Sequence, residues 1–251
     1  MFDVAADSYA RFMGRFSEPL ASKFADLAGV RTGQRALDVG CGPGALTAEL
    51  VKRLGAGAVD AIDPSPSFVA AARARCPGVD VRIGSAEQLP FAAEAFDVTL
   101  AQLVVHFMAD PVAGLAEMAR VTRPGGVAAA CVWDHAAGTG PLAVFWRAVH
   151  DLDPGAPNES GLPGARAGHL AELGAAAGLS HIESSSLTVT VVFETFADWW
   201  DPFTLGVGPA GKYVAGLDPD RRTALHARCE ELLPTAPFPV DGTAWSIRAH
   251  P

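Results

Sequence analysis

The sequence has few lysines and no cluster of basic residues. Lysine occurs at positions 23, 52 and 212 only, and the formal net charge of the 251-residue chain is −9. Nucleic-acid binding depends on clustered cations that displace the counterions of the phosphate backbone. We therefore expect no DNA or RNA partner.

Cysteines are few and widely separated. The four cysteines are Cys41, Cys76, Cys131 and Cys229. They form no C-x-x-C pair and lack histidines at the spacing typical of zinc sites. We expect free thiols and no metal site. Cys41 lies inside a glycine-rich loop, where we expect a small side chain beneath a ligand rather than a nucleophile.

Long hydrophobic runs are also missing. No segment approaches the roughly 20 consecutive apolar residues that span a bilayer. The first residues include Asp3 and Asp7 and contain no continuous apolar segment, unlike a signal peptide. We expect no membrane partner and a cytoplasmic location.

The remaining composition is that of a globular α/β domain. Hydrophobic residues make up 49% of the chain and charged residues 19%, an ordinary balance. The length suits one domain with a sizeable core. Between residues 35 and 134, short apolar runs alternate with amphipathic segments. This alternation predicts a parallel sheet with helices on both faces.

The most informative segment is a glycine-rich loop between a strand and a helix. An apolar run at 36–39 leads into Gly40, Gly42 and Gly44, and an amphipathic helix follows. Glycines let the backbone approach a ligand and adopt dihedral angles closed to other residues. The helix N-terminus adds unpaired N–H groups. This arrangement predicts a site for an adenosine-containing ligand.

The loop is compatible with two classes of ligand. Gly40, Gly42 and Ala45 also satisfy the dinucleotide pattern G-x-G-x-x-G/A, which would indicate a nicotinamide-dependent oxidoreductase. Asp38 opposes this interpretation because its carboxylate repels a pyrophosphate. The same carboxylate favours a ligand that carries an ammonium and a sulfonium. A packing loop without a ligand is the remaining alternative.

A motif at residues 38–44 resembles the first motif of the class I S-adenosylmethionine-dependent methyltransferases, D/E-x-G-x-G-x-G. It reads Asp38-Val39-Gly40-Cys41-Gly42-Pro43-Gly44. Four later segments resemble the following elements of these enzymes in the right order, namely 59–76, 81–91, 96–107 and 110–134. The opening segment, 9–21, is similar to the N-terminal helix of a small-molecule branch, the type 11-like methyltransferases.

The resemblance implies one Rossmann-like domain over residues 1–251, with a seven-stranded, mostly parallel sheet. The sixth and seventh strands are expected at about 181–193 and 242–249, the last one antiparallel. The predicted parts are a helical cover (1–30), a cofactor-binding core (31–135), two inserted lid segments (136–164 and 195–217) and the end of the sheet (165–194 and 218–251).

The resemblance also implies S-adenosylmethionine as the cofactor and indicates the residues that hold it. Asp63, at the end of the second strand, would accept hydrogen bonds from both ribose hydroxyls; alternatively, it caps the helix after Pro64. Gln102 and Leu103 would lie beside the methionine moiety. The predicted set is Tyr9, Met13, Asp38, Gly40, Cys41, Gly42, Gly44, Asp63, Pro64, Ser85, Ala86, Glu87, Gln102, Leu103 and His106.

The predicted adenine loop departs from the family at one position. The family commonly has an acid followed by a small residue, whereas this chain has Ser85 and Ala86. The Ser85 hydroxyl still accepts or donates a hydrogen bond, and Ala86 would lie against the ring. Glu87 either compensates for the missing acid or is a solvated residue of a first helical turn.

Three residues near strand ends are candidates for proton transfer. A neutral His106 would take a proton from a hydroxyl or amine, or else would contact the cofactor or pack between its neighbours. Asp134 and His135 form a possible acid–base pair after the fifth strand, with loop solvation as the alternative. Methyl transfer needs mainly alignment and exclusion of water.

Aromatic residues gather in the two predicted lid segments. They are Trp146, Trp199, Trp200, Phe203 and Tyr213. Such residues outside the main core predict a mostly apolar acceptor pocket beneath a lid; a dimer contact or a small core within the lid are the competing interpretations.

The predicted function is methyl transfer from S-adenosylmethionine to a small, partly apolar molecule. Oxygen is the first expected acceptor atom, followed by nitrogen or carbon. One alternative is a protein that binds the cofactor without methylating and uses its sulfonium charge to promote a rearrangement or cyclisation. The other is the nicotinamide-dependent oxidoreductase.

Overall fold

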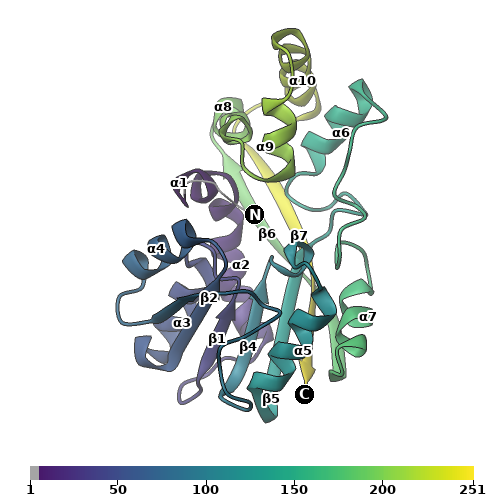
Figure 1. Cartoon of the computed structure of the whole chain (residues 1–251). Coiled ribbons are helices and arrows are strands. Elements are labelled where there is room, and N and C mark those ends of the chain that lie inside the picture. The colour runs from purple at the N-terminus through teal and green to yellow at the C-terminus, as the bar shows by residue number, and fades with distance from the viewer. Residues whose placement is uncertain (1–5) are drawn as a thin grey trace.

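A seven-stranded sheet organises the chain (Figure 1). The computed structural model describes residues 6–251, so residues 1–5 of the predicted helical cover lie outside the described residues. The strand order is β3-β2-β1-β4-β5-β7-β6. The strands are β1 (Ala36–Val39), β2 (Val59–Asp63), β3 (Asp80–Ile83), β4 (Phe96–Gln102), β5 (Thr122–Trp133), β6 (Ser180–Phe193) and β7 (Phe238–His250).

Helices connect and flank these strands. They are α1 (Ala6–Tyr9), η1 (Ala10–Gly14), α2 (Arg15–Leu27), α3 (Ala45–Leu54), η2 (Ala56–Ala58), α4 (Pro66–Arg75), η3 (Val105–Phe107), α5 (Pro111–Val121), α6 (Ala143–Leu152), α7 (His169–Ala176), α8 (Phe196–Trp200), η4 (Asp201–Leu205), α9 (Gly208–Ala215) and α10 (Pro219–Leu232).

The predicted topology is confirmed. Strand β1 pairs in parallel with β2 and β4, β2 with β3, and β4 with β5. Strand β7 is antiparallel to both β5 and β6. The last strand starts at Phe238, earlier than the expected 242, because residues 238–241 continue the ladder with β6.

Helices cover both faces of the sheet, as predicted. On one face, Leu20 of α2 and Leu50 of α3 share a core cluster with Val98 of β4. On the other face, Leu115 of α5 shares a second cluster with Leu37 of β1. Each such buried side chain contributes roughly 1.5–3 kcal/mol to folding.

Three helices begin with the same local pattern. Ser65, Asp110 and Asp218 each precede a proline and cap α4, α5 and α10, respectively, by accepting a hydrogen bond from a backbone N–H of the first turn. A short polar N-cap followed by proline suits a helix start, because proline has no N–H to satisfy there.

A group of helices lies beyond one end of the sheet. Figure 1 shows α6, α8, α9 and α10 together at the top of the molecule, where the long strands β6 and β7 reach them. Helix α6 lies in the predicted lid segment 136–164, and α8, η4 and α9 lie in 195–217. Helix α10 packs against α6, whereas the sequence predicts that residues 218–251 belong to the end of the sheet.

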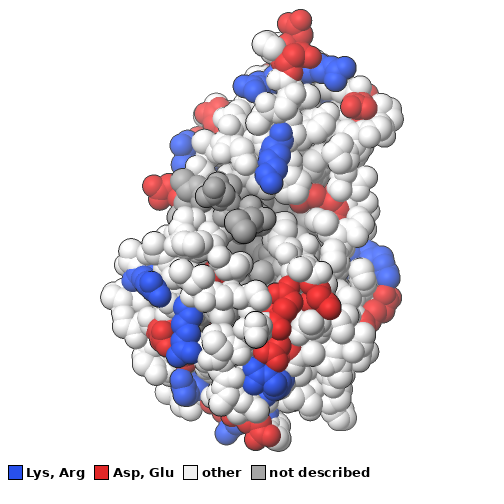
Figure 2. All heavy atoms as spheres, viewed as in Figure 1, with Lys and Arg blue, Asp and Glu red and all other residues white. Residues whose placement is uncertain are grey.

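The surface carries charges of both signs. On the face in Figure 2, Lys and Arg are interspersed with Asp and Glu, and the described residues form no continuous basic patch there. Within residues 6–251, none of the helices has the length and apolar character needed to cross a membrane.

Candidate cofactor and acceptor site

A cavity of about 430 Å³ lies at the carboxyl ends of β1, β2 and β4. This is the edge at which open α/β sheets bind ligands. Of the residues predicted for the cofactor, those that line it are Tyr9, Asp38, Gly40, Cys41, Gly42, Asp63, Pro64, Ser85, Ala86, Glu87, Gln102 and Leu103. Gly44 instead caps helix α3, and Met13 and His106 line a neighbouring cavity.

The glycine loop has the backbone geometry that its sequence predicts. Gly40, Gly42 and Gly44 have φ angles of +71°, +53° and +91°, a region that other residues rarely adopt. The Gly40 N–H donates to the Ile62 carbonyl at 2.8 Å, which ties the loop to β2. A Cβ on Gly40 would lie 2.3 Å from Cγ2 of Val104, so this position has no room for a side chain.

Asp38 presents an unpaired carboxylate oxygen. The residue is 1% exposed, and its Oδ2 accepts a hydrogen bond from Oγ1 of Thr47 at 2.6 Å. Among the described residues, nothing donates to the buried Oδ1. Burial raises the pKa of Asp38 to about 7. Because the unsatisfied acceptor belongs to a residue of the cavity wall, it fits a cationic donor on the ligand.

Gln102 adds a second unsatisfied acceptor. Its Nε2 donates to the Ser17 carbonyl of α2 at 3.0 Å, which fixes the side chain. Its buried Oε1 has no donor among residues 6–251. One residue of β1 and one of β4 in the wall of the same cavity therefore each have an acceptor oxygen without a donor. The ammonium group of S-adenosylmethionine would supply such donors.

Asp63 joins the glycine loop to the start of α4. Its Oδ2 accepts from the Gly42 N–H at 2.9 Å and its Oδ1 from the Ser65 N–H at 2.8 Å. The alternative in which Asp63 caps the helix is wrong, because Ser65 is the N-cap of α4. Burial raises the pKa of Asp63. Each carboxylate oxygen keeps a lone pair, so the predicted ribose contacts fit this geometry.

Glu87 orders the loop that follows β3. One of its oxygens accepts from the backbone N–H groups of Ala109 and Asp110, at 2.8 and 3.3 Å. Burial raises the pKa of Glu87, but the backbone hydrogen bonds and one with Ser85 outweigh it and lower the value overall. Glu87 is therefore not a freely solvated residue of a first helical turn. One of its oxygens already accepts hydrogen bonds from the adjacent loop.

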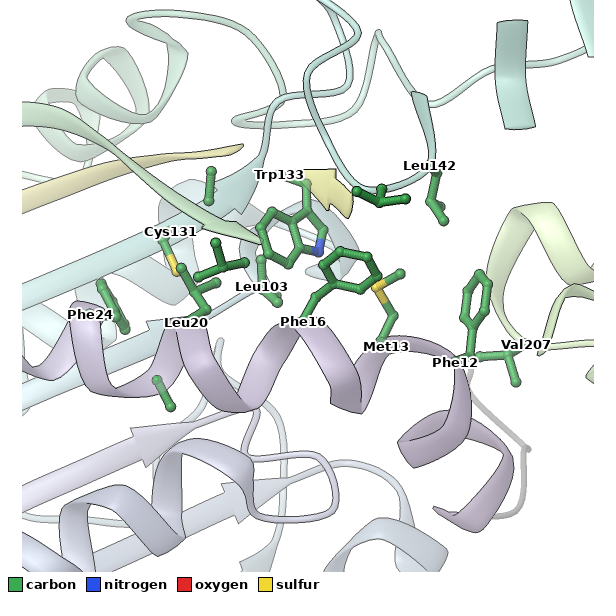
Figure 3. Close-up of a cluster of buried hydrophobic side chains, with 14 of the residues drawn as sticks. Phe12, Met13, Phe16, Leu20, Phe24, Leu103, Cys131, Trp133, Leu142 and Val207 are labelled. Atoms are coloured by element: carbon green, nitrogen blue, oxygen red, sulfur yellow. The ribbon is translucent and has the colours of Figure 1, made fainter. Parts of the chain in front are cut away.

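A second, smaller cavity of about 40 Å³ adjoins the first. The two cavities share Tyr9, Leu103 and Phe107 in their walls. Leu103 has a φ of +61°, an uncommon conformation for a non-glycine residue that is often associated with functional sites. The other residues around the small cavity are Phe12, Met13, His106, Trp133, His135, Leu142, Glu159, Val207, Gly208, Pro209 and Ala210. Figure 3 shows Phe12, Met13, Leu103, Trp133, Leu142 and Val207 in the surrounding hydrophobic cluster.

His106 and His135 face each other at the small cavity. Their ring centroids are 6.0 Å apart. Burial lowers the pKa of His106 to about 3 and that of His135 to about 4, so both imidazoles are neutral at physiological pH. Nδ1 of His106 is buried and has no hydrogen-bond partner in the described part of the chain. A neutral imidazole with a free nitrogen can accept a hydrogen bond from a hydroxyl and take its proton during a reaction, although a pKa of about 3 makes His106 a weak base.

Asp134 holds the loop after β5. Its Oδ1 accepts from the Ala137 N–H at 3.0 Å and its Oδ2 from the Thr139 hydroxyl at 2.7 Å. Asp134 is not among the residues that line the two cavities. Both oxygens serve loop structure, so the geometry gives no support to Asp134 as the acid of an acid–base pair with His135.

The five aromatic residues predicted for the acceptor line neither cavity. Trp146, Trp199, Trp200 and Phe203 are buried, and Tyr213 is partly buried in the same hydrophobic cluster. Phe203 stacks on Phe145 of α6 with centroids 4.5 Å apart. The structure thus agrees with the competing interpretation of a small core within the lid.

Several lining residues carry no sequence signal of their own. In the large cavity these include Ser17, Phe68, Val104 and Met108. In the small cavity, Glu159 and the segment 207–210 come from the two predicted lid segments. The sequence therefore indicates the segments, but other residues of these segments than the predicted aromatic ones line the cavity. In the described part of the chain, no group of His, Cys, Asp and Glu is placed to hold a metal ion.

The chain is similar in sequence to known methyltransferases. A family model described as "Methyltransferase domain" matches residues 37–130, which run from β1 into β5. Aklanonic acid methyltransferase of Streptomyces sp. (strain C5) is 31% identical over 131 residues, covering 50% of this chain and 60% of that protein. Ubiquinone biosynthesis O-methyltransferase of Rhizobium rhizogenes is 40% identical over 117 residues, covering 45% and 46%. The chain thus spans about half the length of these curated relatives.

A solved structure extends the likeness to nearly the whole fold. Phosphoethanolamine N-methyltransferase 2 of Haemonchus contortus, in complex with phosphomonomethylethanolamine and S-adenosylhomocysteine, superposes with a TM-score of 0.61 at 16% identity. The match covers 98% of this chain and 56% of that one. The protein therefore has the class I methyltransferase fold. Residues 37–130, the part of the chain that the family model matches, are similar to a methyltransferase domain.

Proposed function

We propose that this protein transfers a methyl group from S-adenosylmethionine to an oxygen atom of a small, partly apolar acceptor, with nitrogen or carbon as the next acceptor atoms. The observation that carries the proposal is the unpaired Oδ1 of buried Asp38, which lies with the unpaired Oε1 of Gln102 in the wall of a cavity bounded by the glycine loop. The relative of known structure was solved with S-adenosylhomocysteine, and one curated relative is named as an O-methyltransferase.

The chain's own residues bind and orient the cofactor. Asp38 and Gln102 would accept hydrogen bonds from its ammonium, and Asp63 from its ribose hydroxyls. Ala86 and Phe68, in the wall of the large cavity, would pack against its apolar parts. Burial keeps Cys41 in the thiol form by raising its pKa. This residue would therefore act as a small side chain in the cavity wall and not as a nucleophile.

The small cavity, which at about 40 Å³ has room for only part of the acceptor, would receive its polar end, and the rest of the acceptor would lie along the wall that the two cavities share. When bound, S-adenosylmethionine would supply a methyl group on its sulfonium, and transfer to the acceptor oxygen would form a C–O bond, break the C–S bond and release the neutral thioether. His106 would take the hydroxyl proton on its free Nδ1. Leu103, Phe107 and Tyr9, shared by both cavities, would align the two molecules and exclude water.

Two other functions would use the same glycine loop. A pyrophosphate in the large cavity would meet the carboxylates of Asp38 and Asp63, which counts against a nicotinamide cofactor. A protein that binds S-adenosylmethionine without methylating would hold the cofactor and never consume it. Incubation with candidate acceptors and detection of S-adenosylhomocysteine separates this alternative from methyl transfer.

Cofactor binding is expected to strengthen with pH through Asp38. The pKa of Asp38 is about 7 in the free protein, and a cationic ammonium binds the deprotonated form. Calorimetry should therefore show S-adenosylhomocysteine binding that is about tenfold tighter at pH 8 than at pH 6. In contrast, the free energy of unfolding of the free protein should decrease as the pH rises from 4 to 7. In this range the folded state keeps the Asp38 proton, whereas the unfolded state releases it.

Asp38→Asn is the matched variant for this titration. Its amide cannot ionise, so binding should be weaker at pH 8 and nearly independent of pH. The absence of any S-adenosylmethionine or S-adenosylhomocysteine binding at millimolar ligand would refute the proposed function. A pH dependence that persists in Asp38→Asn would show that another group is responsible.

His106→Ala is expected to slow methyl transfer by about 100-fold. This is the lower end of the rate enhancement that a general base typically contributes. S-adenosylhomocysteine affinity should stay within about threefold of the wild-type value, because His106 lines the small cavity and not the large one. Turnover is measured on an acceptor identified by S-adenosylhomocysteine release. Near-normal turnover would remove His106 from the base role.

A further inference from the structure

Glu159 places a carboxyl group in the wall of the small cavity. It lies between α6 and α7 and is 4% exposed. Its Oε2 accepts a hydrogen bond from Nε1 of Trp146 at 2.7 Å. Its Oε1 takes part in none of the hydrogen bonds found among residues 6–251. One oxygen is therefore fixed by the lid core while the other is available.

No charge in the surrounding wall compensates this carboxyl group. The described residues that line the small cavity include no lysine or arginine, and Glu159 belongs to none of the ion pairs in the described chain. The two histidines there are neutral, because burial lowers the pKa of each. An isolated carboxylate in such a place is costly unless a cation pairs with it, and burial accordingly raises the pKa of Glu159.

Two further polar groups of the wall lack partners. Nε1 of Trp133 and Nδ1 of His106 are both buried without a hydrogen bond in the part of the chain that the structure describes. In Figure 3 the indole nitrogen of Trp133 lies on the side of the ring toward Phe16 and Met13, and Met13 is another lining residue of the small cavity. The indole N–H is a donor only, and the Trp133 ring is edge-on to the Phe16 ring with centroids 6.3 Å apart, so we assign the ligand no contact with this N–H.

We propose that Glu159 is a specificity-determining residue that pairs with a positively charged amine of the acceptor, and that the acceptor is an amine that also carries a hydroxyl or phenol oxygen. This rests on the proposed function, because the small cavity adjoins the cofactor cavity through Tyr9, Leu103 and Phe107. The carboxylate also offsets the repulsion between an ammonium and the nearby sulfonium charge. Carboxylate or phosphate acceptors find no cation here and are disfavoured.

The alternative role for Glu159 is to hold Trp146 within the lid core. Glu159→Gln distinguishes the two roles, because the glutamine amide oxygen can still accept from Trp146 Nε1 while the charge is removed. Glu230→Gln is the matched control, since Glu230 is exposed on α10. A purely structural Glu159 would affect stability but not the preference between charged and neutral ligands.

The test uses two matched sets of probes on the full chain with saturating S-adenosylhomocysteine. These are benzylamine, benzyl alcohol and benzoate, and butylamine, butan-1-ol and butyrate. Dissociation constants are measured by ligand-observed NMR titration at pH 7.5. We expect the wild type to bind each amine at least about tenfold more tightly than its alcohol, as desolvated charge pairs do, and each carboxylate most weakly.

In Glu159→Gln, the affinities for each amine and its matched alcohol should differ by no more than about twofold, with the affinity for the alcohol unchanged. Glu230→Gln should keep the wild-type ratio. The proposal is overturned if the wild type shows no preference for the amines, including no binding of any probe, or if Glu159→Gln keeps the preference. Calorimetric binding of S-adenosylhomocysteine is measured separately, so its absence identifies a failure of the proposed function, whereas its presence without an amine preference refutes only the role of Glu159.

Discussion

Gly40→Ala is expected to destabilise the folded protein by about 3 kcal/mol, from left-handed backbone strain and overpacking together. The residue has a φ of +71°, and the new Cβ would lie 2.3 and 2.8 Å from Cγ2 and Cβ of Val104. Val104 follows the end of β4 and lines the large cavity, so its displacement disturbs the cofactor site as well. Chemical denaturation of wild type and variant measures the change.

Gly42→Ala is the matched comparison. Gly42 also has a positive φ, +53°, but a Cβ there would meet nothing within 4 Å. Its stability should fall by only about 1–2 kcal/mol. The added methyl group would occupy the space of the ligand, because Gly42 lines the large cavity, and S-adenosylhomocysteine should bind at least tenfold more weakly, by about 1.4 kcal/mol or more. Equal stability losses in the two variants would contradict the close approach between Gly40 and Val104.

Asp63→Ala is expected to weaken S-adenosylhomocysteine binding by about 100-fold or more. Hydrogen bonds to charged groups contribute about 1.5–3 kcal/mol each, and two ribose hydroxyls would lose their acceptor. The Gly42 and Ser65 N–H groups would also lose the oxygens that now accept at 2.9 and 2.8 Å. Calorimetry gives the affinity, and denaturation gives the accompanying loss of stability.

A double comparison separates the ribose contact from loop disorder. Wild type and Asp63→Ala are titrated with 5′-deoxyadenosine and with 2′,5′-dideoxyadenosine, which lacks one ribose hydroxyl. If Asp63 binds the ribose, removal of the hydroxyl should cost the wild type about tenfold and the variant almost nothing. Equal losses in both proteins would show that Asp63 acts only on the loop.

The parts of the site that depend on local backbone were predictable from the sequence. Gly40, Gly42 and Gly44 adopt positive φ angles. Asp38 lies one residue before the end of β1, and Asp63 ends the adjacent parallel strand β2. These features follow from strand–loop–helix units within about thirty residues, for which residue type and spacing carry the geometry.

The acceptor side was not predictable in the same way. Aromatic composition indicated Trp146, Trp199 and Phe203 as acceptor contacts, but their rings pack on one another and on Phe145. Bulk apolar character does not tell a lid core from a ligand wall, because both bury the same kind of surface. Glu159, in a loop rich in proline and glycine, gave no periodic or spacing signal at all.

The sequence by itself determined the mostly parallel sheet, the glycine loop and most of the residues that line the large cavity, since hydrophobic periodicity and glycine conformation act over short stretches of chain. Only the tertiary structure decided which side chains come together at the small cavity. His106 and His135 come to face each other across 6.0 Å, and Glu159 comes to share their cavity, through the packing of segments far apart in the chain. This packing excludes water from the three side chains. Their burial then shifts their pKa values.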